Sequence, residues 1–249
     1  MKRAVLKLEA LSKSFGALPV AEAIGLEVLA GETHAIIGPN GAGKTSLINQ
    51  ISGALAPDRG RIVFEDRDVT QMSVAARAHL GFARSFQITQ VLPHFSALEN
   101  VALAVQARSG SSFRFWQAAA GEAALNRAAV QSLDSVDLAA RADTPAGALS
   151  HGEKRRLEIA IALAQAPKLL LLDEPMAGAG IEETQRLVAT LKSLKGRYTI
   201  VLVEHDMQAV FALADRISVL VAGRIIASGE PQAVRANPAV RAAYLGETT

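Results

Sequence analysis

The chain has 249 residues, half of them hydrophobic and only 4% aromatic, and its formal net charge is +2. A chain of this length buries a substantial core, and an apolar content carried mostly by aliphatic residues favours helices packed on a buried sheet, so the expected class is α/β. Basic residues are spread along the sequence, which gives no reason to expect nucleic-acid binding, and the absence of cysteine excludes disulfides, zinc-thiolate sites and thiol chemistry.

The first third of the chain is expected to consist mainly of strands. Short alternations of apolar and polar residues and one β-branched run, THAII, are typical of strands, and a glycine follows that run directly. The pattern predicts strands at 5–9, 24–29, 33–37 and 61–69, and helices at about 43–53 and 74–80.

The middle of the chain is expected to form an inserted helical subdomain at 88–165. Its pattern is helical from 96 to about 133, and a Gly and Ser cluster at 108–116 marks a loop inside it. Beyond it, continuous apolar runs favour parallel strands buried on both faces. The pattern there predicts strands at 168–174, 199–204 and around 216–229, helices at 181–195 and 207–214, and short closing helices.

The stretch GPNGAGKT, residues 38–45, satisfies the phosphate-loop pattern G-x-x-x-x-G-K-[ST], and it lies between a predicted strand and a predicted helix, as that motif requires. Its glycines let backbone amides face the phosphates of a nucleotide, Lys44 would neutralise phosphate charge, and Thr45 would ligate Mg²⁺. The motif predicts a P-loop NTPase core, with an ordinary glycine turn as the alternative. The predicted nucleotide-binding residues of this segment are Gly38, Pro39, Asn40, Gly41, Ala42, Gly43, Lys44, Thr45 and Ser46.

Two acidic residues, Asp173 and Glu174, close the apolar run LLLL. A charge at the end of a buried strand is costly unless it meets a cation or a reacting group. The pair suits a magnesium-site acid followed by a carboxylate that activates water for attack on the γ-phosphate, with simple turn formers as the alternative. Together with the phosphate loop it indicates ATP or GTP hydrolysis, but kinases, GTPases and motor proteins share this fold and loop.

The segment LSHGEKRRLEIA, residues 149–160, narrows these possibilities. Ser150 and Glu153 have the spacing of a capping box, so a plain helix start explains them structurally. The segment also lies just before LLLLDEP in a chain that has a phosphate loop near its start, and this order resembles the LSGGQ signature of ATP-binding cassette (ABC) proteins, with His151 for the first glycine and Glu153 for the glutamine. The resemblance implies that Ser150, Gly152 and Glu153 cap the ATP held by an opposing subunit, a task that a helix N-terminus suits.

Three more residues match landmarks of that family. Gln87 occupies the place of the Q-loop glutamine, which senses Mg²⁺ and the attacking water, and His205 occupies that of the switch histidine at the γ-phosphate. Phe15 resembles the aromatic residue that stacks on adenine, with core packing as its alternative. Gly180 departs from the family, because it replaces the aspartate of the loop after the two acids, and no catalytic residue is expected in that loop.

The resemblance covers nearly the whole chain, and LSHGEKRRLEIA, DEPMAGAG and the ending NPAVRAAYLGE look like the ATPase subunits of bacterial branched-chain amino acid importers. It implies one domain over 1–249, with an N-terminal antiparallel part beside a mostly parallel sheet. It further implies ATP and Mg²⁺ as ligands, Glu174 as general base, and metal contacts from Thr45, Gln87 and Asp173. The expected partners are transmembrane permease subunits, a second ABC ATPase and, indirectly, a periplasmic solute-binding protein, with the chain at the cytoplasmic face of the inner membrane.

Two other classes of function stay open at this point. A soluble ABC ATPase acting on ribosomes or DNA-repair complexes would have no permease, but such proteins usually carry tandem cassettes or a long coiled-coil insertion, and this chain shows neither. A P-loop kinase would transfer phosphate to a small molecule, and it leaves the signature segment and His205 unexplained. The sequence does not identify the transported solute, because the permease and the binding protein contact it.

Overall fold

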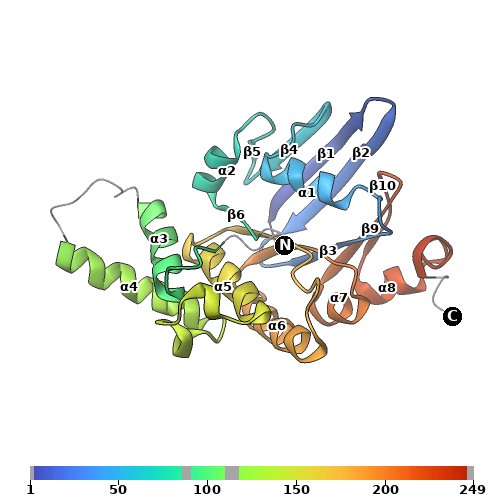
Figure 1. Cartoon of the computed structure of the whole chain (residues 1–249). Coiled ribbons are helices and arrows are strands. Elements are labelled where there is room, and N and C mark those ends of the chain that lie inside the picture. The colour runs from blue at the N-terminus through green and yellow to red at the C-terminus, as the bar shows by residue number, and fades with distance from the viewer. Residues whose placement is uncertain (1–2, 86–90, 110–117, 246–249) are drawn as a thin grey trace.

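The structure of the chain, a computed structural model, describes residues 3–85, 91–109 and 118–245. Figure 1 shows an N-terminal antiparallel sheet beside a second sheet, with a group of helices at one end of the molecule and the C-terminal helices at the other. None of the described helices is both long and apolar enough to cross a membrane.

The N-terminal sheet has the strands β1 (Ala4–Phe15), β2 (Leu18–Leu29), β4 (Arg59–Phe64) and β5 (Arg67–Asp68). Their order is β2-β1-β4-β5, and every pair is antiparallel. The predicted strands at 5–9 and 24–29 are therefore parts of one long hairpin. Its outer half was not predicted because β-bulges near Ala10 and Ala23, which have φ of 48° and 49°, interrupt the alternation of apolar and polar residues.

The single strand predicted at 61–69 is wrong, because the structure has a hairpin there. β4 ends at Phe64, the chain turns at Glu65 and Asp66, and β5 begins at Arg67. Both turn residues have positive φ, 47° and 65°, as in a type I′ turn, which favours Asn and Gly. Asp66 suits such a turn because Asp tolerates positive φ, but Glu65 does not favour it, so the sequence carries only a weak signal of the break.

The second sheet has the strands β3 (Thr33–Ile37), β6 (Phe82–Arg84), β7 (Leu169–Asp173), β8 (Thr199–Val203), β9 (Arg216–Val221) and β10 (Arg224–Gly229). Their order is β10-β9-β3-β8-β7-β6, and only the β9–β10 pair is antiparallel among the described strands of this sheet. The predicted mostly parallel sheet is thus confirmed. Every residue of β3, β7 and β8 is buried, which explains their continuous apolar runs.

The carboxyl ends of β3, β8 and β7 lie side by side at one edge of this sheet, because the three strands are parallel neighbours in that order. Ile36 pairs with Val203, and Val203 pairs with Asp173, so the three ends are in register. The phosphate-loop segment and the segments after β7 and β8 therefore meet at this edge, the usual place of a ligand site in an open α/β sheet.

The helices follow the predicted order, with small shifts at their ends. α2 has the predicted bounds, and the described parts of the predicted helical region from 96 to about 133 form two helices. Most of the loop predicted between them at 108–116 lies outside the described residues. The helices are α1 (Lys44–Ser52), α2 (Val74–Leu80), α3 (Ala97–Ser109), α4 (Ala118–Asp134), α5 (His151–Ala164), α6 (Ile181–Leu194), α7 (Met207–Leu213), α8 (Pro231–Ala236) and α9 (Pro238–Val240), with 3₁₀ turns at Ala139–Arg141 and Ala146–Ala148 and a π-helical turn at Arg241–Leu245.

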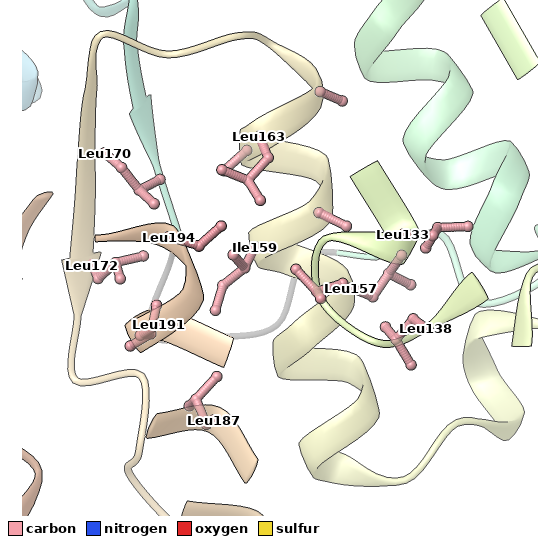
Figure 2. Packing of buried hydrophobic residues seen from close by; sticks show 14 of the residues in the cluster. Leu133, Leu138, Leu157, Ile159, Leu163, Leu170, Leu172, Leu187, Leu191 and Leu194 are labelled. Atoms are coloured by element: carbon pink, nitrogen blue, oxygen red, sulfur yellow. The ribbon is translucent and has the colours of Figure 1, made fainter. Parts of the chain in front are cut away.

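Helix α5 packs with α4 on one side and with β7 and α6 on the other (Figure 2). Figure 2 shows Leu157 on the side of α5 that faces Leu133 and Leu138, and Ile159 and Leu163 on the side that faces β7 and α6. All five side chains are buried in one continuous hydrophobic cluster. The start of α5, which carries the SHGE residues, therefore has a fixed position relative to the sheet.

Candidate active site

The phosphate-loop segment is packed against strands from both sheets. At Gly43, where φ is 105°, an added Cβ would collide with the carbonyl oxygen of Val20 on β2, and at Gly38 it would collide with that of Leu220 on β9. Ala42 between the two glycines is buried. Glycine is therefore required at both positions because the neighbouring backbone approaches so closely.

The first turn of α1 begins at this loop. Its N-cap is Gly43, and no side chain of the described residues caps the helix. Thr45 is exposed and Ser46 half-buried in this turn, and Asn40 and Gly41 are exposed in the loop before it. The amides at an uncapped helix N-terminus have no partner within the helix and bind anions such as phosphate. The arrangement can therefore bind the phosphates of a nucleotide.

The side chain of Lys44 lies against the loop that precedes it. Its Nζ donates to the carbonyl oxygens of Gly38 at 2.7 Å and Pro39 at 3.0 Å, and the residue is only 6% exposed. Burial lowers the pKa of Lys44, and the negative charges of Glu174 and Asp173 partly oppose that shift. The structure thus brings the predicted ammonium and both predicted carboxylates into one site.

Asp173 is the last residue of β7, and its side chain is only 3% exposed. Its Oδ2 accepts a hydrogen bond from Nη2 of Arg84 at 2.9 Å. Nη1 of Arg84 also donates to Oδ1 of Asn49 at 2.6 Å and to Oγ of Ser52 at 3.1 Å, both on α1. A buried ion pair of this kind argues against an ordinary turn-forming role for Asp173. Through these hydrogen bonds Arg84 connects β6 to β7 and α1.

Glu174 follows directly and has a backbone conformation that non-glycine residues rarely adopt. Its φ is 47°, and its N–H donates to the carbonyl oxygen of Val203 at 2.8 Å. Such a conformation costs about 1–3 kcal/mol and persists only where the surroundings impose it, most often at functional sites. The hydrogen bond to the end of β8 is one such constraint, because it extends the β7–β8 pairing one residue beyond Asp173.

The start of α5 forms the capping box that the sequence predicts. Oγ of Ser150 accepts from the Glu153 amide at 3.2 Å, and Oε2 of Glu153 accepts from the Ser150 amide at 2.8 Å. The bond from the Ser150 amide is the main reason that the pKa of Glu153 is lowered. Nε of Arg141 also lies 3.2 Å from Oε1 of Glu153.

The amide of Gly152 binds a carboxylate from the next helix. It donates to Oε1 of Glu183 on α6 at 3.2 Å, and an added Cβ at Gly152 would lie 2.8 Å from Cδ of Glu183. Arg156 and Arg186 line the same small pocket. One amide at the helix start therefore already holds an anionic group, which shows that this end of α5 suits negative charge.

We predict that Ser150→Ala lowers the free energy of unfolding by about 1 kcal/mol, because it removes the side-chain cap of α5. Glu153 has a lowered pKa, so its share of the stability is present above the ordinary Glu pKa of about 4.3 and is lost as the pH falls through the lowered value. Urea unfolding at pH 7 and at decreasing acidic pH measures both effects. Ser135→Ala is the control, because Ser135 lies just beyond α4 and its exposed hydroxyl only donates back to the carbonyl oxygen of Gln131. Equal stability of the two variants at pH 7 would contradict the prediction.

The remaining predicted residues have different surroundings. His205 follows β8 with a 56% exposed side chain, and its Nδ1 lies 3.6 Å from Oε2 of Glu204. Phe15 ends β1 and is 53% exposed, with the Lys13 ammonium 5.8 Å from its ring centre, so core packing does not explain it. Gln87 lies outside the described residues.

These residues divide into two groups. The phosphate-loop segment, Glu174 and His205 follow neighbouring parallel strands and lie at one edge of the sheet. Within the described part of the chain, the hydrogen bonds of Ser150 and Gly152 go to Glu153 and Glu183, and the pocket at this helix start is lined by residues of α5 and α6 and not by the phosphate loop. One subunit therefore contains two separate anion-binding surfaces.

Of the three predicted metal ligands, the described residues include the Thr45 hydroxyl in the first turn of α1 and the Asp173 carboxylate at the end of β7, whereas Gln87 lies outside them. No group of three or more His, Cys, Asp or Glu side chains suited to a metal occurs among the described residues. This set fits Mg²⁺, which proteins commonly hold with one or two carboxylates while nucleotide phosphates and water complete the shell. It does not fit a metal that needs a cage made only of protein ligands.

Sequence reasoning missed three residues that hold the site together: Arg84, Glu183 and Glu204. Arg84 in FARSFQ follows two apolar strand residues, so a partner acid on a neighbouring strand could have been sought. Glu204 ends TIVLVE next to His205, and a carboxylate directly after a fully buried strand is a comparable signal. No feature of the sequence indicates that Glu183 contacts α5.

Comparisons with known proteins agree with this geometry. The model of the ABC transporter family matches residues 21–177, and a model described as branched-chain amino acid ATP-binding cassette transporter matches residues 224–248. The chain is 36% identical, over 99% of its length and 100% of the relative's, to the high-affinity branched-chain amino acid transport ATP-binding protein LivG of Escherichia coli K12.

Two solved structures show the same architecture. The ADP conformation of MJ1267, an ATP-binding cassette of an ABC transporter, has a TM-score of 0.85 at 32% identity and covers 98% of this chain and 100% of that one. A dimeric post-hydrolysis state of the cassette MJ0796, bound to ADP and Pi, has a TM-score of 0.76 at 25% identity and covers 91% and 98%. The chain therefore belongs to the ABC transporter family, as one of its ATP-hydrolysing ATP-binding cassettes.

Proposed function

We propose that the chain is the ATP-hydrolysing subunit of an importer for branched-chain or other amino acids. It would work at the cytoplasmic face of a bacterial inner membrane, on transmembrane permease subunits that receive solute from a periplasmic binding protein. The name of the E. coli relative and the match over 224–248 support this substrate class. Within the single domain 1–249, the helical subdomain 88–165 would face the permease.

The observation that carries the proposal is the separation of the two anion-binding surfaces within one subunit. The phosphate loop lies at the sheet edge, whereas Ser150 and Gly152 make their contacts within α5 and α6. Two subunits, identical or similar, can complete each other's sites if the start of α5 in one closes on the nucleotide held by the other. The dimeric state of the MJ0796 cassette supports this arrangement. Nucleotide binding and subunit closure would then be one event.

Binding of the nucleotide would use residues from both subunits. The exposed ring of Phe15 would stack on adenine, and the loop amides and Lys44 would hold the β- and γ-phosphates. The start of α5 in the opposite subunit, with Ser150, Gly152 and Glu153, would cap the bound ATP. Mg²⁺, when bound, neutralises phosphate charge, and Thr45, Asp173 and Gln87 would hold it.

Hydrolysis would depend on two side chains at the same sheet edge. Glu174 would accept a proton from the attacking water, and His205 would donate a hydrogen bond to the γ-phosphate. Gln87 would carry the change at the nucleotide to the helical subdomain. Gly180 is the N-cap of α6 and has no catalytic part in this scheme.

The proposal is tested by reconstituting the chain with its permease subunits in lipid vesicles and measuring the ATPase rate with binding protein added. Binding protein loaded with a branched-chain amino acid is expected to stimulate hydrolysis above the level of the empty form. Stimulation by another class of solute alone would overturn the substrate class. Co-purification with ribosomes or DNA-repair complexes, and not with membrane proteins, would favour the soluble alternative.

A further inference from the structure

We propose that Glu204 is a positioning residue for ATP hydrolysis, because it holds the segment after Glu174 and the segment that carries His205 in one arrangement. The proposal rests on the catalytic roles given to Glu174 and His205 above. It assigns a function to the buried carboxylate of Glu204, which has no part in those two roles. Glu204 directly follows β8 and has no exposed surface.

The carboxylate of Glu204 accepts three backbone hydrogen bonds from two different segments. Its Oε1 accepts from the amide of Met176 at 2.9 Å, two residues after Glu174. Its Oε2 accepts from the amides of His205 at 2.8 Å and Asp206 at 3.2 Å. One oxygen thus holds the segment after β7, and the other holds the segment after β8.

The backbone around Glu174 is consequently held on both sides of that residue. Its own N–H donates to the carbonyl oxygen of Val203, the last residue of β8, and the amide of Met176 donates to Glu204. These two bonds leave little freedom for the left-handed conformation at Glu174 to relax, so they explain how an unfavourable φ of 47° is maintained. Loss of the Glu204 oxygen would release one of them.

The segment with His205 is held equally closely. Glu204 binds the His205 and Asp206 amides, and Oδ1 of Asp206 in turn accepts from the amides of Gln208 and Ala209 at the start of α7. A shift of His205 would therefore have to break the Glu204 bonds or move the cap of α7. Because the same carboxylate also holds Met176, the positions of His205 and Glu174 are coupled.

A carboxylate suits this place better than an amide. Both of its oxygens accept, and the three backbone groups bonded to them are all donors. Glutamine has the same shape but only one acceptor, so its NH₂ group would face either Met176 or the His205 and Asp206 amides with donor against donor. Glu204→Gln therefore removes one side of the link with little change in volume.

The test uses the basal ATPase of the isolated chain, so it does not depend on the proposed import function. We expect Glu204→Gln to lower kcat about tenfold to hundredfold, the loss that a small misplacement of reacting groups causes. The Kd of a fluorescent ATP analogue should change less than about twofold, because the hydrogen bonds of Glu204 go to the Met176, His205 and Asp206 amides and to no amide of the phosphate loop. Glu204→Asp, which keeps both acceptors on a shorter stem, serves if the Gln variant does not fold, and an intermediate loss of kcat is expected.

Glu32→Gln is the matched control. Glu32 is 3% exposed, accepts from the Leu29 amide at 3.0 Å and lies 2.6 Å from Nδ1 of His34, but it precedes β3 at the opposite edge of the sheet. It should lower the melting temperature and leave kcat unchanged. If it lowers kcat as much as Glu204→Gln does, a general effect of removing a buried carboxylate explains both, and the proposal is overturned.

A double-mutant cycle separates positioning from stability. In a His205→Ala background, Glu204→Gln should lower the single-turnover rate by a clearly smaller factor than in the wild type, while its effect on the melting temperature stays the same. Wild-type kcat in Glu204→Gln, or an undiminished factor in the His205→Ala background, would overturn the proposal. Wild-type hydrolysis by His205→Ala itself would instead overturn the role given to His205.

Discussion

Replacing Glu174 by glutamine is expected to slow ATP turnover by about 10²–10⁴-fold, the usual contribution of a general base. Glutamine keeps the size of the side chain and cannot accept the proton of the attacking water. The phosphate-loop amides and Lys44 are untouched, so ATP should still bind. Phosphate release under single-turnover conditions measures the loss, and binding of a fluorescent ATP analogue shows that the site is intact.

The same variant tests the closed pair of subunits. If ATP is bound but not hydrolysed, the start of α5 in one subunit stays on the nucleotide of the other, and light scattering should show an ATP-dependent dimer. Glu182→Gln is the control, because Glu182 is an exposed acid in the first turn of α6. Wild-type turnover in the Glu174 variant would remove the assignment of the base, and a strictly monomeric variant with ATP present, unable to pair with any related ATPase, would contradict the two-subunit site.

The phosphate loop and the start of α5 could be predicted from the sequence because their constraints are local. Eight consecutive residues define the loop at 38–45. Its close contacts with β2 and β9 explain why glycine is needed at Gly43 and Gly38, but the motif is recognisable without them. The capping box needs Ser150 and Glu153 three positions apart, and the structure contains both of its hydrogen bonds. Patterns of this kind can be recognised in the sequence without knowing how the rest of the chain is arranged.

The contacts that orient the site could not be predicted in the same way. Arg84 and Asp173 are 89 residues apart in the chain, and Met176 and Glu204 are 28 apart. Each pair meets because β6, β7 and β8 are neighbours in the sheet, and no local pattern specifies that order. Strand ends were also misjudged where a bulge or an unusual turn residue such as Glu65 interrupts the alternation.

Other assignments depended on resemblance, because single residues carry little information. An isolated histidine after a strand has many structural explanations, and only its order after the phosphate loop and signature segment singled out His205. For Phe15 the structure adds an independent observation, since an aromatic residue that is 53% exposed does not belong to the core. Burial thus decides between alternatives that the sequence leaves equal.

Replacing Lys44 by methionine is expected to weaken ATP binding by at least about 2 kcal/mol, or about thirtyfold in Kd, because it removes a buried cation that meets the phosphates. Methionine keeps the apolar stem and the volume. Burial lowers the pKa of Lys44, so the charged form is disfavoured without a ligand. In the Lys44→Met variant the cost of burying the charge is absent, which stabilises the fold, but the hydrogen bonds to the Gly38 and Pro39 carbonyls are lost, which destabilises it. Because these two changes oppose each other, the melting temperature should shift little.

Lys168→Met is the matched control for this prediction. The side chain of Lys168 is 55% exposed and its ammonium pairs with Glu65 on the surface, and exposed pairs contribute at most about 1 kcal/mol. Calorimetry with ATP and Mg²⁺ should therefore give the wild-type Kd for Lys168→Met and a much weaker one for Lys44→Met. If Lys44→Met binds ATP as tightly as the control, then the ammonium only supports the Gly38 and Pro39 carbonyls, and the loop amides alone must hold the phosphates.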